Sequence, residues 1–90
     1  MNVASNRPLT RALIHDTLWK AVAQRAEKVP RDLRPTDRFL HELGFDSLDV
    51  AEFAMEVEEE LAITLPDKMF DNPELSLGDV EEAICAQHVK

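Results

Sequence analysis

The feature that most constrains the fold is a helical repeat of apolar residues between residues 47 and 62. Apolar side chains recur there at intervals of three and four, at Val50, Phe53, Ala54, Val57 and Leu61. This spacing places them on one face of an α-helix, and most of the other positions are acidic. A helix of this kind is stable only when its apolar face is buried, so the segment predicts a packed bundle.

Two further segments show the same periodicity. The first begins near residues 8–10, where Pro8 suits a first turn and Thr10 can cap, and should end before Pro30. The last follows Ser76-Leu77-Gly78-Asp79, which matches a capping box. A brief helical turn is expected at residues 67–70, after Pro66.

The connections between these helices show no sign of a sheet. Pro30 and Pro35 predict an ordered loop, which Leu33 should hold to the core, and Gly44 suits a positive φ. No segment alternates strictly over the length of a strand. We therefore predict an all-α four-helix bundle with three longer helices and one short helix. It forms a single domain over residues 8–90, after a flexible tail at residues 1–7.

Composition narrows the class of protein. The longest apolar run, residues 83–86, is far shorter than the ~20 residues of a membrane span, and no secretory signal is recognised. The lone Cys85 cannot form an internal disulfide, which fits a cytoplasmic setting. Net charge is −8, with +4 over residues 1–36 and −12 over residues 37–90. Such an acidic surface disfavours nucleic acid and favours either simple solubility or a basic protein partner.

The sequence gives no support for a metal site or for catalysis. His15, His41 and His88 lie at no ligand spacing from one another, and there is no calcium-binding loop, so no metal is expected. Ser47 lies outside any nucleophile elbow, and nothing positions a base beside it. A small serine hydrolase is therefore strongly disfavoured, and no catalytic residue is predicted.

Ser47 nevertheless occupies a chemically useful position at the start of the acidic helix. A helix start offers unpaired N–H groups and a partial positive charge, which favour a phosphate. The simpler alternative is that Ser47 is only an N-cap, although Asp46 could cap as well. The residues alone leave both interpretations open.

The stretch "LGFDSLD", residues 43–49, resembles the modification motif of acyl carrier proteins. The likeness continues through "DSLDVAEFAMEVEEELAITLPD" and the preceding "TDRFLHEL", and it covers about residues 9–88. The resemblance implies that a phosphopantetheinyl transferase attaches 4′-phosphopantetheine from coenzyme A to Ser47. The protein would then carry acyl groups as thioesters on this arm, without catalysing a reaction itself.

The resemblance also implies a docking surface and an acyl pocket. Partner enzymes would dock through basic patches of their own. They would be acyl ligases, synthases or transferases of fatty-acid, polyketide or related lipid biosynthesis. The docking residues of this chain would be Asp46, Leu48, Asp49, Glu52, Met55, Glu58 and Glu59. Glu56 and Glu60 would add charge nearby. Candidate pocket residues are Phe39, Leu43, Ala54, Val57, Leu65, Met69 and Leu75.

A monomer without membrane insertion is expected. The bulky Phe70 and Pro73 after Pro66, together with the basic first helix, suggest a carrier dedicated to one pathway. The alternatives are an aminoacyl or peptidyl carrier protein and an unmodified helical adaptor.

Overall fold

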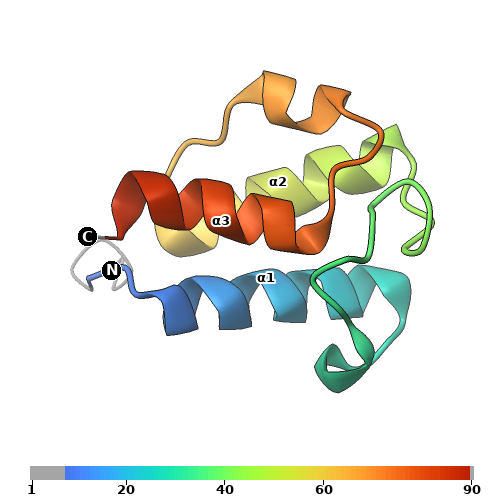
Figure 1. The fold of residues 1–90 in the computed structure, drawn as a ribbon, viewed down its shortest axis with the longest axis horizontal. Coiled ribbons are helices and arrows are strands. Elements are labelled where there is room, and N and C mark those ends of the chain that lie inside the picture. Colours follow the sequence, from blue (N-terminus) through green and yellow to red (C-terminus); the bar gives the residue numbers. More distant parts are fainter. Residues whose placement is uncertain (1–7, 90) are drawn as a thin grey trace.

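The fold is all-α, as predicted. A computed structural model describes residues 8–89, and the predicted tail at residues 1–7 lies outside them. Three α-helices, α1 (Arg11–Ala26), α2 (Ser47–Leu61) and α3 (Leu77–His88), form the body of this part of the chain. In Figure 1, α1 runs along the bottom of the view, with α3 and α2 above it.

Helix α1 begins and ends with local hydrogen bonds that its sequence provides. The Thr10 hydroxyl accepts a hydrogen bond from the Leu13 N–H at 3.1 Å, which confirms Thr10 as the cap. Glu27 ends the helix in the left-handed conformation, with φ of 56°. The helix contributes six residues to the core: Ile14, Leu18, Trp19, Ala21, Val22 and Ala23.

Helix α2 has the predicted start and ends one residue earlier than predicted. Phe53, Val57 and Leu61 of its apolar stripe are buried, whereas Val50 and Ala54 are half-buried at its edge. Ala62 adopts the left-handed conformation, with φ of 56°, and its N–H donates to the Glu58 carbonyl. This cap stops the helix before Pro66 could distort it.

Two short segments have 3₁₀ geometry. The loop between the two prolines contains one turn, η2 (Pro30–Asp32), which packs against α1, where we had expected no helical turn. Proline is well tolerated at the start of such a turn because it needs no N–H there. The predicted short fourth helix is also a 3₁₀ segment, η3 (Asp67–Asp71). The count of four α-helices is therefore not reached in residues 8–89.

One hydrophobic core joins these elements. α1 packs against both α2 and α3, and the four phenylalanines cluster between α2, η3 and the loop before α2. Leu33 is 6% exposed, so it holds the proline loop to the core as predicted. Gly44 has the expected positive φ, at 66°. The described residues contain no strand, only one isolated bridge between Arg38 and Ser76.

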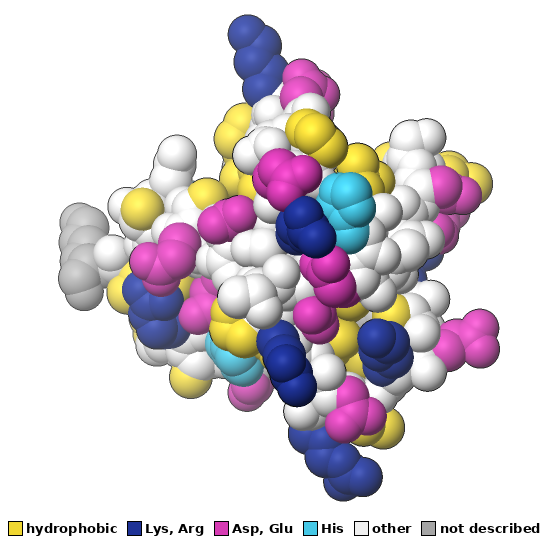
Figure 2. Space-filling model, turned by 45° about the vertical axis from the view of Figure 1, so that its right-hand side comes forward, with side chains coloured by type: hydrophobic (Ala, Val, Ile, Leu, Met, Phe, Trp, Pro, Cys, Tyr) yellow, Lys and Arg dark blue, Asp and Glu magenta, His cyan; other side chains and the backbone are white. Residues whose placement is uncertain are grey.

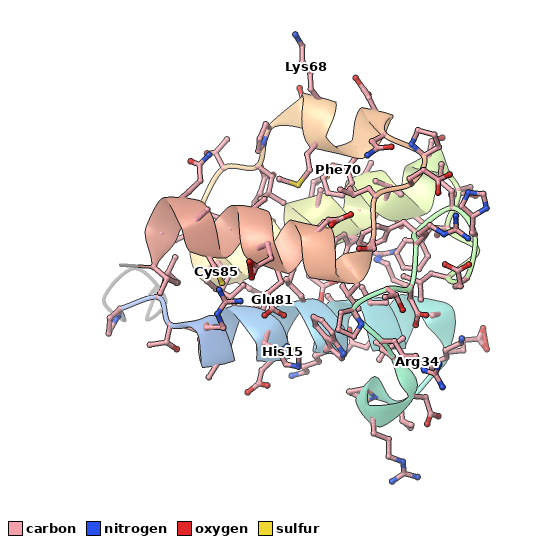
Figure 3. The ribbon with its side chains drawn as sticks, viewed as in Figure 1. His15, Arg34, Lys68, Phe70, Glu81 and Cys85 are labelled. Atoms are coloured by element: carbon pink, nitrogen blue, oxygen red, sulfur yellow. The ribbon has the colours of Figure 1, made fainter. Side chains whose placement is uncertain are left out.

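The contact between α1 and α3 includes a histidine, His15, at the edge of the core. His15 stacks on Trp19 with ring centroids 3.8 Å apart, and its Nδ1 lies 2.8 Å from the Glu81 carboxylate. Arg11 reaches the same carboxylate at 3.2 Å. Figure 3 shows His15 and Glu81 facing each other from the two helices. His15 is therefore a contact between helices.

Gly78 allows α3 to approach the proline loop closely, and replacing it by Ala should destabilise the fold. Its N–H donates to the Pro35 carbonyl at 2.8 Å. A Cβ at this position would lie 2.9 Å from the Pro35 Cβ and 3.0 Å from the Pro35 oxygen. Although Ala normally stabilises a helix relative to Gly by ~0.5–1 kcal/mol, this clash should reverse the sign, with a net loss of about 1–2 kcal/mol.

The test is the urea midpoint of Gly78→Ala, compared with that of Gln87→Ala on an exposed part of α3. The control should change stability by less than about 0.5 kcal/mol. A more stable Gly78→Ala protein would show that the loop moves away from α3 at little cost.

Candidate functional site

Ser47 is the first residue of α2 and is exposed. Phe45, in the turn before Ser47, is 5% exposed and packs this turn against the core. The Phe45 N–H donates to the Phe39 carbonyl at 2.7 Å, and its ring packs against those of Phe39 and Phe53. A buried aromatic two residues before Ser47 thus fixes the serine at the surface of a rigid turn.

The cap of α2 is formed by Asp46 and not by Ser47. The Asp46 carboxylate accepts from the Asp49 N–H at 2.8 Å, and the Asp49 carboxylate accepts from the Asp46 N–H at 3.1 Å. Together these two bonds form a capping box. Within residues 8–89 the Ser47 hydroxyl has no hydrogen-bond partner, so it is available for chemistry from outside.

An ionic cluster supports the loop that leads to this turn. Arg38 donates to both oxygens of the Glu42 carboxylate, at 2.8 and 3.0 Å, and to Glu74 at 2.6 Å. His41 lies 3.6 Å from the same Glu74. The cluster links the loop before Ser47 to the segment between η3 and α3.

The Arg38 guanidinium, together with the Arg38 backbone N–H, lowers the pKa of Glu42 from 4.5 to about 2. Because the pKa is lower in the folded state, ionised Glu42 stabilises the fold above pH 4.5. This contribution is lost as pH falls toward about 2. In Glu42→Gln the contribution is absent at every pH. We therefore expect the stability difference between the native protein and the variant to be largest near neutral pH and to close on acidification.

Urea midpoints measured at several pH values between 7 and about 2.5 provide the test. A difference between the two proteins that stays constant over this range would contradict the role of the ionised carboxylate.

A groove of about 480 Å³ opens beside Ser47, between α2 and η3. We call it the Ser47 groove. Its walls are mostly apolar and also include three carboxylates, and its lining residues are Leu40, Ser47, Val50, Ala51, Ala54, Met55, Glu58, Leu65, Pro66, Asp67, Phe70 and Asp71. Phe70 points from η3 toward α2 (Figure 3). A group attached to Ser47 therefore has an apolar surface directly next to it.

The predicted pocket residues are distributed unevenly around this groove. Ala54 and Leu65 line it. Phe39, Leu43 and Val57 are buried in the core, whereas Met69 and Leu75 are half-buried and pack against that core. The sequence analysis did not include Val50, Ala51 and Phe70 in the pocket. Val50 and Ala51 lie at helical spacing from Ala54 and Met55, so their place beside Ala54 could have been predicted from the sequence. Phe70 belongs to a separate segment, and helical spacing gives no information about it.

The predicted docking residues occupy several environments. Leu48 and Met55 are 64% and 59% exposed, and Glu59 is also exposed. Glu52 pairs with Arg25 of α1 at 2.8 Å. Glu58 lines the Ser47 groove, and its carboxylate accepts from the Leu65 N–H at 2.7 Å. Asp46 and Asp49 form the capping box described above, so several of these acids also stabilise the fold.

A metal site, a membrane-spanning helix or a reactive cysteine in residues 8–89 would indicate a different function. No group of three metal-ligating side chains comes together there. None of the helices described has the length and apolar character needed to cross a membrane. Cys85 is a buried free cysteine, and burial raises the pKa of its thiol.

Comparison with known proteins connects this geometry to a family. The family described as "Phosphopantetheine attachment site" matches residues 16–84. An acyl carrier protein of Wolinella succinogenes is 34% identical over 67 residues, which cover 74% of this chain and 87% of the relative. The acyl carrier protein of Chlorobium luteolum is 30% identical over 76 residues, covering 84% and 92%.

A putative mitochondrial acyl carrier protein of Schizosaccharomyces pombe is 46% identical over 50 residues. The aligned part covers 56% of this chain and only 44% of that relative's length. The Wolinella and Chlorobium relatives are matched over most of their length, and the family match includes all of α2 with Ser47 and most of α1 and α3. The chain therefore belongs to the phosphopantetheine-attachment family and, within it, to the acyl carrier proteins.

Proposed function

We propose that Ser47 receives 4′-phosphopantetheine from coenzyme A through a phosphopantetheinyl transferase, and that the chain then carries acyl groups. The observation that supports this most directly is the division of roles at the start of α2. Asp46 makes the cap, while the Ser47 hydroxyl is exposed and has no hydrogen-bond partner in the described residues. The fold therefore presents a hydroxyl whose modification removes no internal contact.

The start of α2 suits a phosphodiester. Backbone N–H groups in the first turn of a helix lack intrahelical partners, and the helix dipole places partial positive charge there. A phosphodiester on Ser47 would lie close to both. When attached, phosphopantetheine supplies a terminal thiol that holds the acyl group as a thioester. The protein's own contribution is to position that arm and to expose it to other enzymes.

The Ser47 groove is the proposed place for an acyl chain when no enzyme is docked. Its apolar lining begins at the attachment point and continues along Val50, Ala54 and Phe70. Covering the chain there removes apolar surface from water. Of the pocket residues predicted from the sequence, Ala54 and Leu65 are the strongest candidates because they line this groove.

The exposed face of α2 is the proposed docking surface for partner enzymes. Leu48 and Met55 offer apolar contacts, and Glu59 is an exposed acid near them on the helix. Asp46, Asp49, Glu52 and Glu58 contribute charge although each also has a bond within the protein. Contacts of this kind are fast and weaken in salt, as a carrier that must leave each enzyme requires.

The docking proposal predicts that Glu59→Gln slows modification by a phosphopantetheinyl transferase. We expect kcat/KM for the carrier to fall roughly two- to five-fold at low ionic strength, as for loss of one surface ion pair. The loss should shrink as salt is added. Asp32→Asn, which removes an equal charge from exposed η2, is the matched control. Equal effects of both variants would indicate that only net charge matters.

Intact mass spectrometry tests the carrier function. Incubation of the protein with coenzyme A and a broad-specificity transferase should add one phosphopantetheine group. Acyl ligases should then load this form with a fatty acid, and hydroxylamine should release the acyl group, as expected of a thioester. Loading by amino-acid ligases instead would favour an aminoacyl carrier. The absence of any mass gain would refute the proposal and leave an unmodified adaptor.

Further features complete the proposal. We infer that the chain has no catalytic activity and is a monomer that serves fatty-acid, polyketide or related lipid biosynthesis. In this view, η3 takes the place of the short helix in a four-helix arrangement of acyl-carrier type.

The buried free Cys85 is compatible with the reducing cytoplasm. The S. pombe relative is named mitochondrial, so imaging of a fluorescent fusion is the direct test of the compartment.

A further inference from the structure

A second groove, of about 610 Å³, lies between α1 and η2. We call it the α1–η2 groove. Trp19 and Leu33 form its floor, each 6% exposed, and Pro30 and Pro35 form apolar walls. Its remaining lining residues are polar: His15, Asp16, Lys20 and Arg31. The sequence analysis assigned no function to any of these positions.

Two basic side chains that line this groove, Lys20 and Arg31, have no carboxylate partner within the described residues. Among residues 8–89, Arg11, Arg25 and Arg38 each pair with a carboxylate of the protein. The other five Lys and Arg residues in this part of the chain are exposed and make no such pair within 4 Å: Lys20, Lys28, Arg31, Arg34 and, on η3, Lys68. Figure 2 shows Lys and Arg side chains spread over the lower half of the visible face, where α1 and η2 lie, with Asp, Glu and hydrophobic side chains among them.

The acids on this side do not cancel the basic charge. Asp16 lines the groove, and Asp32 and Glu27 are exposed nearby in the sequence. Of the six Lys and Arg in residues 11–36, Arg11 and Arg25 are paired with carboxylates of α3 and α2, which leaves four cations against these three acids. The surroundings of the groove thus keep a small positive excess, four minus three, on a protein whose net charge is −8.

The α1–η2 groove is separate from the face that carries Ser47. In Figure 1, η3 crosses the top of the molecule and η2 lies at the bottom, beneath α1. No residue is shared between the linings of the two grooves. Figure 3 shows the same separation, with Lys68 projecting from η3 and Arg34 lying near η2. A protein bound at η2 would leave Ser47 and the exposed face of α2 accessible.

We propose that the α1–η2 groove docks an acidic segment of a second protein, while α2 remains free for an enzyme. An apolar side chain of that segment fills the groove over Trp19 and Leu33. Carboxylates on either side of it pair with Lys20 and Arg31, which have no partner among the described residues. The protein would thus connect two partners, one bound through each face.

The charge and shape of the chain favour an acidic peptide segment over other anionic partners. A membrane surface or a nucleic acid presents an extended array of phosphates, which the net charge of −8 repels. A peptide segment contacts only the local basic patch. A shallow groove with Trp19 in its floor also offers a place for one side chain, which an extended lipid surface does not supply.

Selection of peptides on the phosphopantetheine-bearing 90-residue chain is the first step of the test. A library of random 12-residue peptides is panned, and bound sequences are expected to be enriched in Asp and Glu around a Leu, Met or Phe. Trp19 then reports binding, because it is the only Trp in a chain without Tyr and lies in the floor of the groove. Titration of an enriched peptide should change its fluorescence with saturation.

Charge reversal locates the binding site. Arg31→Glu should weaken the enriched peptide at least ten-fold, whereas Lys68→Glu, an equal change on η3, should alter its affinity by less than two-fold. Ser47→Ala protein should bind the peptide as tightly as the native chain. This result would separate the second docking surface from the carrier function, because it does not depend on phosphopantetheine.

Other outcomes would overturn the proposal. Enriched peptides that lack acids, or binding that is equally weakened by both reversals, would exclude a local basic site. Displacement of the peptide by vesicles containing an anionic lipid, with vesicle binding lost in Arg31→Glu, would assign the groove to a membrane surface. Concentration-dependent dimerisation lost in the same variant would assign it to a second copy of this chain.

Discussion

Ser47→Ala should abolish phosphopantetheine attachment completely and leave the fold intact. The substitution removes the Ser47 hydroxyl, which is exposed and has no hydrogen-bond partner within residues 8–89. It does not disturb the cap, which Asp46 and Asp49 make between themselves. Intact mass after incubation with coenzyme A and a transferase should show one added group on the native protein and none on the variant. Thermal unfolding should give melting temperatures within a few degrees of each other.

Variants of Asp46 form the matched comparison for the stability of the fold. Asp46→Ala keeps the Ser47 hydroxyl but removes the cap, and helix caps contribute about 1 kcal/mol. Asp46→Asn should restore most of that stability, since Asn caps as well as Asp. Attachment to the Ser47→Ala protein would contradict our assignment and would place the arm on another hydroxyl.

Phe53→Ala should cost the largest share of the folding free energy of any single truncation on α2. Its side chain is fully buried, and its ring lies 5.2 Å from that of Phe39 and within 6.4 Å of those of Phe45 and Phe70, centroid to centroid. Truncation of a buried Phe typically costs 3–5 kcal/mol, through lost burial and the cavity left behind. A domain of this size has only about 5–15 kcal/mol in total, so the variant should be marginally folded.

Urea unfolding followed by circular dichroism measures this loss. Met55→Ala, two residues along the same helix but 59% exposed, is the control and should change stability by about 0.5 kcal/mol or less. If Phe53→Ala unfolded at nearly the same urea concentration as the native protein, the aromatic cluster would have to collapse around the cavity far better than a packed core normally does.

Local sequence patterns predicted the helices well because their signals are contained within a few residues. The spacing of Phe53 and Val57 defined the buried face of α2, and Ser76 with Asp79 defined the start of α3. The same patterns could not decide between Asp46 and Ser47 as the cap. Both are good capping residues, they are adjacent, and only the backbone conformation at Asp46 distinguishes them.

Contacts between distant segments were beyond such patterns. The Ser47 groove needs Phe70 from η3 as well as α2, and the bond from the Leu65 N–H to Glu58 turns a predicted docking acid partly inward. Arg25 lies within the apolar stripe of α1. It is half-buried there, and its charge is paired with that of Glu52 on α2. Each of these depends on how the helices pack, which no single segment encodes.

The short segment η3 affects how the molecule responds to cargo. It has five residues in 3₁₀ geometry, so it lacks the continuous ladder of bonds that makes α2 stiff. Phe70 and Met69 are only half-buried and attach it to the core. Displacing this wall would separate Phe70 and Met69 from the core, whereas displacing α2 would unfold the domain. The groove therefore has one rigid side and one more compliant side, and if it holds an acyl chain as proposed, we expect chains of different bulk to be accommodated by local opening at η3.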